Sequence, residues 1–430
     1  MEYIEVINSL GESRRFSRLV MGSDHLFESG WVHPSQSEPS KEKVFDVLDE
    51  SARLGINLFD TSPIYVGGSE SRLGEWRNTR RDRAARSDFY VNSRLNPDRD
   101  LYILSKGGFP YDLYRLKELP AGCHSQKLVD ELKKRGIADP NANDWSSQPL
   151  KLSNVPPGTY ASHLYCNEDI MIQRISEERE ETCKNLLCDI DVYLMHRDDS
   201  DAIGFERVKR KPTSVKDILN AISSDKVSGG IFVFGLSNWV THRVNKTLKL
   251  ANENTQALKY PSFNSPYFSL FEMSGRSIHA LGVQVTHDEM MDTNFQKGIL
   301  IMPYSPLGGF SILDKPEPQW ENAKRDAFEK FQAKDSYWQN VYPAIFTAEN
   351  EARWQRVQSF AKNFNAKHDT NYTIDQFLNA YVLAHPRTDM LVIGALTVEQ
   401  VRRTVSSIKL SKMLSPKDLE HLYSGTGLPT

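Results

Sequence analysis

The chain has 430 residues, 39% of them hydrophobic and 25% charged, which is the composition of an ordinary globular protein with a large buried core. The formal net charge of −3 gives no electrostatic case for a nucleic acid or an anionic membrane as partner, so we expect neither. Four cysteines in a chain of this length argue against a disulfide-stabilised fold, and no metal-ligand spacing is present.

The chain begins with residues 3–16, which we expect to form a hairpin. Beyond it, short apolar runs predict strands, and segments with helical periodicity lie between them. The predicted strands cover residues 18–22, 56–60, 101–105, 190–195, 231–236, 260–264, 299–304 and 390–393. The predicted helices include residues 41–54, 69–77, 169–187, 214–226, 240–253, 351–365 and 373–384. This alternation predicts a parallel sheet, and the number of strands predicts a TIM (β/α)8 barrel whose bottom is capped by the hairpin.

Two longer segments interrupt the alternation, at about residues 109–165 and 310–350, and each follows a predicted barrel strand. Loops that follow barrel strands lie on the catalytic face, so we expect both insertions there. Each could form a lid or pocket wall, or instead an interface or a self-packed loop. We expect residues 1–430 to form a single domain that carries both insertions.

Polar side chains follow three of the predicted strands. Asp60 ends the apolar run at residues 56–59 and Tyr65 lies in the turn that follows, while Lys106 and His196 follow the strands at 101–105 and 190–195. The carboxyl ends of parallel strands meet at one rim, so these side chains should lie together. A phenol has a pKa of about 10, and we expect the lysine to lower that of Tyr65. Each residue alone also fits a structural role, as a surface ion pair, a packing tyrosine or a structural histidine.

Together, Asp60, Tyr65, Lys106 and His196 resemble the Asp-Tyr-Lys-His tetrad of the aldo-keto reductase family, in which the Tyr likewise follows the Asp by five residues. Three further segments resemble family segments that hold the nicotinamide carboxamide, the nicotinamide ring and the adenosine phosphate. They are residues 235–239, 303–309 and 392–400. The matches run in chain order from about residue 14 to 410. The resemblance implies a barrel enzyme that binds its cofactor without a Rossmann domain.

The resemblance also implies a role for each tetrad residue in reducing a carbonyl group. A nicotinamide hydride attacks the carbonyl carbon while negative charge grows on the oxygen, and Tyr65 would protonate that oxygen as general acid. Lys106, held by Asp60, would place positive charge beside the phenol and lower its pKa. His196 would donate a hydrogen bond to the same oxygen.

The cofactor site implied by the resemblance departs from the family pattern in two places. Ser265 stands where many members have Gln, and Gly394-Ala395 replaces a Lys-Ser pair of some branches. Arg402 and Arg403 on the next helix could meet a 2′-phosphate, so we expect NADP as the cofactor, with NADPH preferred over NADH. The implied cofactor residues are Asp60, Ser237, Asn238, Ser265, Tyr304, Ser305, Leu307, Gly309, Gly394, Thr397, Gln400 and Arg403.

The predicted function is NAD(P)H-dependent hydride transfer to or from a small-molecule carbonyl or alcohol. Two alternatives remain: a nucleotide-binding regulatory subunit, and a redox-neutral dehydratase or epimerase that uses the cofactor transiently. The intact tetrad argues against a subunit that has lost its chemistry. The first residues lack the features of a signal peptide and no run of about 18 apolar residues occurs, so a cytoplasmic location is expected.

Overall fold

The computed structural model describes most of the barrel and parts of both insertions. An antiparallel hairpin opens the chain, formed by β1 (Tyr3–Ile7) and β2 (Ser13–Ser17), as the sequence predicts. The described residues are 1–24, 26–27, 40–65, 68–84, 101–109, 111–112, 117–119, 132–134, 136–139, 150–155, 160–161, 168–198, 213–254, 258–274, 282–308, 320–334 and 338–426.

The central element is an 8-stranded parallel sheet in the order β13-β12-β11-β10-β5-β4-β3-β14. Its strands are β3 (Leu19–Gly22), β4 (Leu58–Asp60), β5 (Tyr102–Gly107), β10 (Val192–Met195), β11 (Val233–Ser237), β12 (Phe263–Ser265), β13 (Leu300–Ile301) and β14 (Leu391–Ile393). The two ends of the sheet meet, because the backbone N–H groups of Met390 and Val392 donate to the carbonyls of Ile301 (3.2 Å) and Pro303 (2.8 Å). The predicted (β/α)8 barrel is therefore confirmed.

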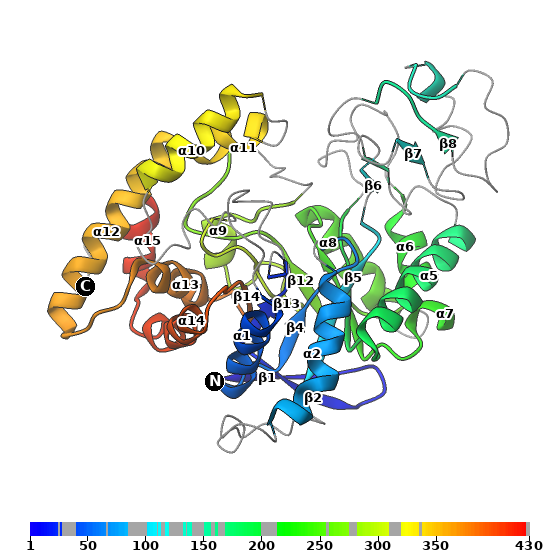
Figure 1. Cartoon of the computed structure of the whole chain (residues 1–430), viewed down its shortest axis with the longest axis horizontal. Helices are drawn as coiled ribbons and strands as arrows, with labels where there is room; N and C mark the ends of the chain where they lie inside the picture. Colours follow the sequence, from blue (N-terminus) through cyan, green and yellow to red (C-terminus); the bar gives the residue numbers. More distant parts are fainter. Residues whose placement is uncertain are drawn as a thin grey trace.

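Helices surround this barrel (Figure 1). They are α1 (Lys41–Arg53), α2 (Ser69–Ala84), α5 (Glu168–Leu186), α6 (Val215–Ser223), α7 (Asp225–Ser228), α8 (Thr241–Glu253), α9 (His287–Met291), α10 (Trp320–Gln332), α11 (Trp338–Ile345), α12 (Ala348–His368), α13 (Ile374–Ala384), α14 (Val398–Ser411) and α15 (Pro416–Ser424). The sequence analysis missed α15, although Ser415 and Asp418 form a capping box around Pro416. Within the described ranges, no helix combines the length and apolar character needed to cross a membrane.

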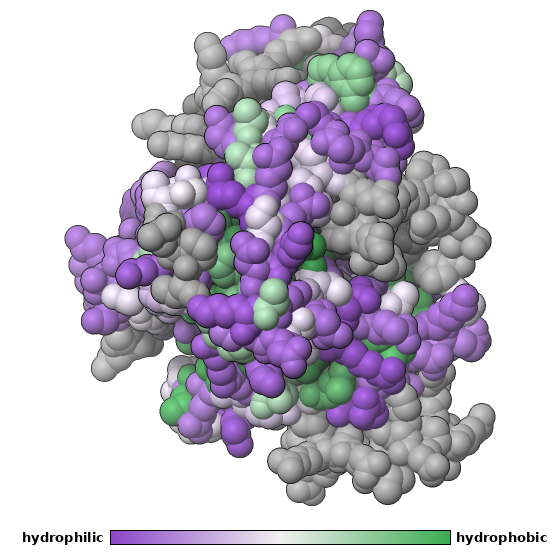
Figure 2. Space-filling view, turned by 90° about the vertical axis from the view of Figure 1, so that its left-hand side faces the viewer, coloured by the Kyte–Doolittle hydropathy of each residue, from purple (hydrophilic) through white to green (hydrophobic). Residues whose placement is uncertain are grey.

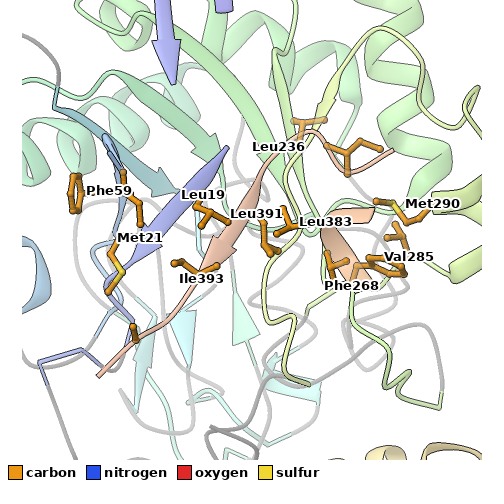
Figure 3. Close-up of a cluster of buried hydrophobic side chains, with 14 of the residues drawn as sticks. Leu19, Met21, Phe59, Leu236, Phe268, Val285, Met290, Leu383, Leu391 and Ile393 are labelled. Atoms are coloured by element: carbon orange, nitrogen blue, oxygen red, sulfur yellow. The ribbon is translucent and has the colours of Figure 1, made fainter. Parts of the chain in front are cut away.

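Successive side chains along each barrel strand pack alternately in two hydrophobic cores. On β3, the side chains of Leu19 and Met21 pack in the outer core between the strands and the helices, whereas Val20 packs in the inner core. Figure 3 shows the outer core, where Leu19 lies beside Leu391 of β14, its partner in the parallel register. Phe16 of the hairpin also belongs to the inner core, where its ring contacts those of Tyr102 and Phe263.

The same alternation directs polar side chains at the strand ends into the barrel. Because successive strand residues face opposite sides, a residue two positions after an inner-core residue faces inward as well. Asp60, Lys106 and His196 each stand two positions after a leucine of the inner core, namely Leu58, Leu104 and Leu194. The fold thus brings these three side chains to one end of the barrel interior.

The described parts of both insertions lie at the end of the barrel opposite the hairpin, as Figure 1 shows, which fits the expected placement on the catalytic face. The first contributes two small antiparallel sheets. They pair β6 (Tyr111–Asp112) with β9 (Tyr160–Ala161), and β7 (Glu118–Leu119) with β8 (Leu150–Lys151). In the second, Trp338 and Val341 of α11 pack in a cluster with Tyr267, and Tyr304 lies against this cluster. The second insertion therefore contacts the barrel rim.

The outer surface on the α12 side of the barrel is polar. Figure 2, which views the left-hand side of Figure 1, shows this face to be mostly hydrophilic, with apolar residues scattered over it. The helix α12 has this character itself: Trp354, Val357 and Phe360 are buried, while most of its exposed positions are polar or charged, such as Gln355 and Lys362. The apolar residues of the helix layer are thus directed toward the barrel.

Candidate active site

Three of the predicted site residues form one hydrogen-bonded group at the barrel rim. The ammonium of Lys106 makes an ion pair with Asp60 and donates to the Tyr65 hydroxyl (2.8 Å) and to the carbonyl of Thr61 (3.3 Å). A lysine has three donors, and all three are used here. The side chains of Lys106 and Asp60 are buried, while Tyr65 as a whole residue is half-buried.

The residue after Lys106 is a glycine that lies very close to a side chain of the neighbouring strand β10. Gly107 follows the lysine on β5, and a Cβ at that position would lie 1.7 Å from the hydroxyl oxygen of Tyr193 on β10. A side chain at position 107 would therefore displace the buried Tyr193 ring, which packs in the outer core beside this strand end.

His196 follows β10 and completes the group. Its Nδ1 lies 3.1 Å from the hydroxyl oxygen of Ser62, and its ring lies edge-on to that of Tyr65, with centroids 6.1 Å apart. Phe109, two residues beyond Gly107, also packs against the His196 ring, with ring centroids 4.9 Å apart. The structure thus brings all four tetrad residues together, from the ends of three neighbouring strands.

Burial controls the protonation of this group. It raises the pKa of Asp60 and lowers that of Lys106, and the ion pair between them opposes both shifts. The pKa of His196 lies well below its usual value because the ring is buried and the charges of Arg197 and Lys106 disfavour its protonation. His196 is therefore a neutral imidazole near neutral pH.

The sequence-based prediction that Lys106 lowers the pKa of Tyr65 is wrong for this structure. Burial, followed by the charges of Asp60 and Asp24, raises the pKa of Tyr65 well above its usual value. The physical reason is that Asp60 balances the charge of Lys106, so the phenol lies beside a neutralised pair rather than a free cation. Tyr65 therefore holds its proton at neutral pH, as a proton donor must.

A tyrosinate titration of the cofactor-free protein tests this direction. Because the folded-state pKa is raised, we expect Tyr65 to stay protonated up to about pH 10, the ordinary pKa of a phenol. The ultraviolet titration curves of the wild type and Tyr65→Phe should then coincide below that pH. A tyrosinate signal near pH 8 that Tyr65→Phe lacks would contradict the prediction.

The residues implied for the nicotinamide end of the cofactor also lie together, next to the tetrad. The amide of Asn238 donates to Ser237 Oγ (2.8 Å) and to the carbonyl of His196 (3.4 Å), and its Oδ1 accepts from the Tyr304 hydroxyl (2.5 Å). Ser237 Oγ donates in turn to the carbonyl of Ser265 at 3.2 Å. One hydrogen-bond network therefore joins the ends of β11 and β12 to the tetrad.

Two residues of this region have left-handed backbone conformations, since φ is 58° at both Asn238 and Ser305. Asn adopts this conformation more readily than most residues, whereas at Ser it costs about 1–3 kcal/mol. The turn after β13 is held by a hydrogen bond from Gly308 N to the carbonyl of Ser305 (3.0 Å). Such strain is typical of functional sites.

The residues implied for the adenosine-phosphate end of the cofactor lie at or near the N-terminus of α14, and each has a hydrogen-bond or ion-pair partner within the protein. Thr397 and Gln400 form the capping box at its N-terminus. Arg402 pairs with Glu50 of α1 (2.7 Å), and Arg403 pairs with Asp375 of α13 (3.0 Å).

The other implied cofactor residues vary in their surroundings. Gly394 is exposed, and a Cβ there would meet nothing within 4 Å. Leu307 is partly buried against the outer core. Gly309 lies outside the described residues.

Three residues near the tetrad were not singled out from the sequence. Ser62 contacts His196, Arg197 directly follows it with its guanidinium 4.9 Å from the Phe109 ring centroid, and Asp24 follows β3. The sequence signal that could have identified them is their position, because two of them lie next to predicted site residues and the third follows a strand end. Across the described part of the chain, no group of three or more His, Cys, Asp or Glu side chains could hold a metal ion.

The chain is similar to known proteins in both sequence and fold. Residues 18–134 and 165–423 match the sequence profile of the aldo/keto reductase family. Among solved structures, the chain is similar to the crystal structure of a thermostable aldo-keto reductase in complex with the inhibitor epalrestat. The TM-score is 0.52 at 16% sequence identity, over 99% of each chain, which shows a shared fold. No curated protein sequence gives a significant match.

Proposed function

Because the chain belongs to the aldo-keto reductase family, a family of oxidoreductases, we propose that it transfers a hydride between a nicotinamide cofactor and a small-molecule carbonyl or alcohol. The observation that carries this proposal is the hydrogen bond from Lys106 Nζ to the Tyr65 hydroxyl at 2.8 Å. Since the lysine occupies a lone pair of the phenol oxygen, the phenol hydrogen is left for Asp60 or for a substrate. The distance from Tyr65 to Asp60 Oδ2 is 3.5 Å, which is a weak bond that a substrate oxygen can replace.

In the proposed mechanism, a carbonyl substrate binds with its oxygen between Tyr65 and His196. A nicotinamide cofactor held beside the tetrad would supply the hydride for the carbonyl carbon. As negative charge grows on the oxygen, the neutral His196 donates a hydrogen bond to it and Tyr65 transfers its proton. Lys106 stabilises the phenolate that remains, and Asp60 holds the lysine in place. In alcohol oxidation the same proton returns to Tyr65.

Residues on the cofactor side support this proposal. The Ser237 hydroxyl and the Asn238 amide lie beside the tetrad and suit the carboxamide of a nicotinamide, and Tyr304 is fixed by its bond to Asn238. The helix α11 of the second insertion packs against Tyr267 and Tyr304 of the barrel. This contact supports the proposal that the insertion and the barrel belong to one domain. The cytoplasmic location expected from the sequence stays a prediction.

An assay of NADPH oxidation with a panel of aldehydes and ketones tests the proposed function. We expect steady oxidation of the cofactor that depends on the carbonyl compound, with one alcohol formed per NADPH consumed. Tight cofactor binding without turnover on any substrate would favour the regulatory subunit. Substrate conversion without net NADPH consumption would favour the dehydratase or epimerase.

We further propose that NADPH is preferred over NADH because Arg402 or Arg403 meets the 2′-phosphate near the N-terminus of α14. Helix N-termini attract anions through their free N–H groups, and a guanidinium adds charge-assisted bonds. The side chain of Arg402 is 54% exposed and can exchange Glu50 for a phosphate. Arg403 is more enclosed beside Asp375. Arg402 is thus the better placed of the two.

Replacing both arginines with Ala should weaken NADPH binding by about tenfold to a hundredfold, because one charge-assisted bond contributes roughly 1.5–3 kcal/mol. NADH binding should change little. Titrations of both cofactors against both proteins, followed by protein fluorescence, measure the effect. Equal losses for the two cofactors would show that the arginines serve only their ion pairs with Glu50 and Asp375.

A further inference from the structure

The hydrogen bond between Ser62 and His196 determines which nitrogen of the imidazole carries its proton. Both residues are buried, and Ser62 Oγ lies 3.1 Å from His196 Nδ1. Among the described residues, the Ser62 hydroxyl makes no other side-chain hydrogen bond. Its hydrogen therefore has one acceptor available within this part of the structure, the Nδ1 lone pair.

His196 has a single ring proton to place, because it is neutral. Lys106 and Arg197 are the charged groups that disfavour a second proton. If the proton were on Nδ1, that N–H would donate to Ser62 Oγ and the serine hydrogen would be left without a partner. A buried donor without a partner costs roughly 1–3 kcal/mol. If the proton is on Nε2, the serine donates to Nδ1 and both groups are satisfied.

We propose that Ser62 is a positioning residue that holds His196 as the Nε2–H tautomer and so gives the site a hydrogen-bond donor for the substrate oxygen. The consequence for catalysis rests on the proposed function, whereas the tautomer itself does not. Ser62 lies between Asp60 and Tyr65 in the same turn, so that turn supplies the ion-pair partner, the proton donor and the group that orients the histidine. The other tautomer would present a lone pair to the substrate oxygen and repel it.

Nitrogen-15 NMR of the imidazole ring tests the tautomer without any substrate. The chain has 11 histidines, and the His196 signals are identified by their loss in His196→Asn. We expect the wild-type protein at pH 7 to carry the proton on Nε2 and to show Nδ1 as an unprotonated, hydrogen-bonded nitrogen. A proton on Nδ1, or a doubly protonated ring, overturns the proposal whether or not the protein reduces carbonyl compounds.

Kinetics of Ser62 variants test the consequence. Ser62→Ala should lower kcat/KM for a good carbonyl substrate by about tenfold, as expected for the loss of one hydrogen bond, and leave the Kd for NADPH unchanged. Ser62→Thr keeps a hydroxyl and should restore most of the activity. Ser51→Ala is the matched control, since it removes an equally buried serine hydroxyl whose bond goes to the Val47 carbonyl in α1. Wild-type kcat/KM in Ser62→Ala, or an equal loss in Ser51→Ala, overturns the positioning role.

Discussion

Tyr65→Phe is expected to lower the turnover of carbonyl reduction by about 10²–10⁴-fold, the usual contribution of a positioned general acid. The substitution removes one oxygen atom and its proton and leaves the ring in place. Binding of the cofactor should therefore stay nearly unchanged. Steady-state kinetics with a good substrate, together with a fluorescence titration of the cofactor, measure the two effects separately. Retention of more than about a tenth of the wild-type turnover would show that another group protonates the substrate oxygen.

Tyr193→Phe provides a matched control for this experiment. Tyr193 is buried, and its hydroxyl has no hydrogen-bond partner among the described residues. It lies on β10 and its side chain packs in the outer core, away from the barrel interior. The same chemical change should therefore leave turnover close to that of the wild type. A large loss in both variants would indicate a general sensitivity of the fold to the change from Tyr to Phe.

The second large effect is expected for Lys106→Met. Its side chain and that of Asp60 are 5% and 4% exposed, so the substitution leaves a buried carboxylate without its cation. Breaking a buried ion pair from one side destabilises a protein by about 3–5 kcal/mol. Turnover should also be lost, because nothing then stabilises the phenolate of Tyr65. Urea unfolding measures the first effect and steady-state kinetics the second.

The double variant Asp60→Asn/Lys106→Met separates these two effects. It removes both charges, so most of the lost stability should return, because no buried charge remains unpaired. Turnover should not return, since the cation beside the phenol is still missing. Recovery of activity together with stability would mean that the ion pair serves the fold alone.

The barrel and its rim could be predicted from local sequence patterns, because the strands are short apolar runs and those that carry Asp60, Lys106 and His196 lead into these polar residues. Strand ends were less predictable. The run at 299–304 yields only Leu300–Ile301 as strand, because Pro303 has no backbone N–H with which to continue the ladder. The helix α9 was missed because it has only five residues and therefore little periodicity, although Thr286 and Glu289 form its capping box.

The electrostatics of the site could not be predicted from sequence, because they depend on contacts between distant segments. Glu50 precedes Arg402 by 352 positions, and nothing near the arginine indicates that it has an acidic partner. The same holds for Tyr65, whose pKa follows from burial and from the pairing of Asp60 with Lys106. Residue types identified the members of the site, and packing determined their charges.

The three hydrogen bonds of Lys106 also bear on the chemical safety of the site. Primary amines condense with aldehydes to form imines, and an enzyme that binds aldehydes beside a lysine risks being blocked by its own substrate. Condensation requires a free lone pair on the nitrogen. In this site the nitrogen is held as an ammonium by Asp60, Thr61 and Tyr65, so it has no lone pair to offer. The arrangement that supports proton transfer thereby also keeps the lysine inert toward the compounds that we propose the protein reduces.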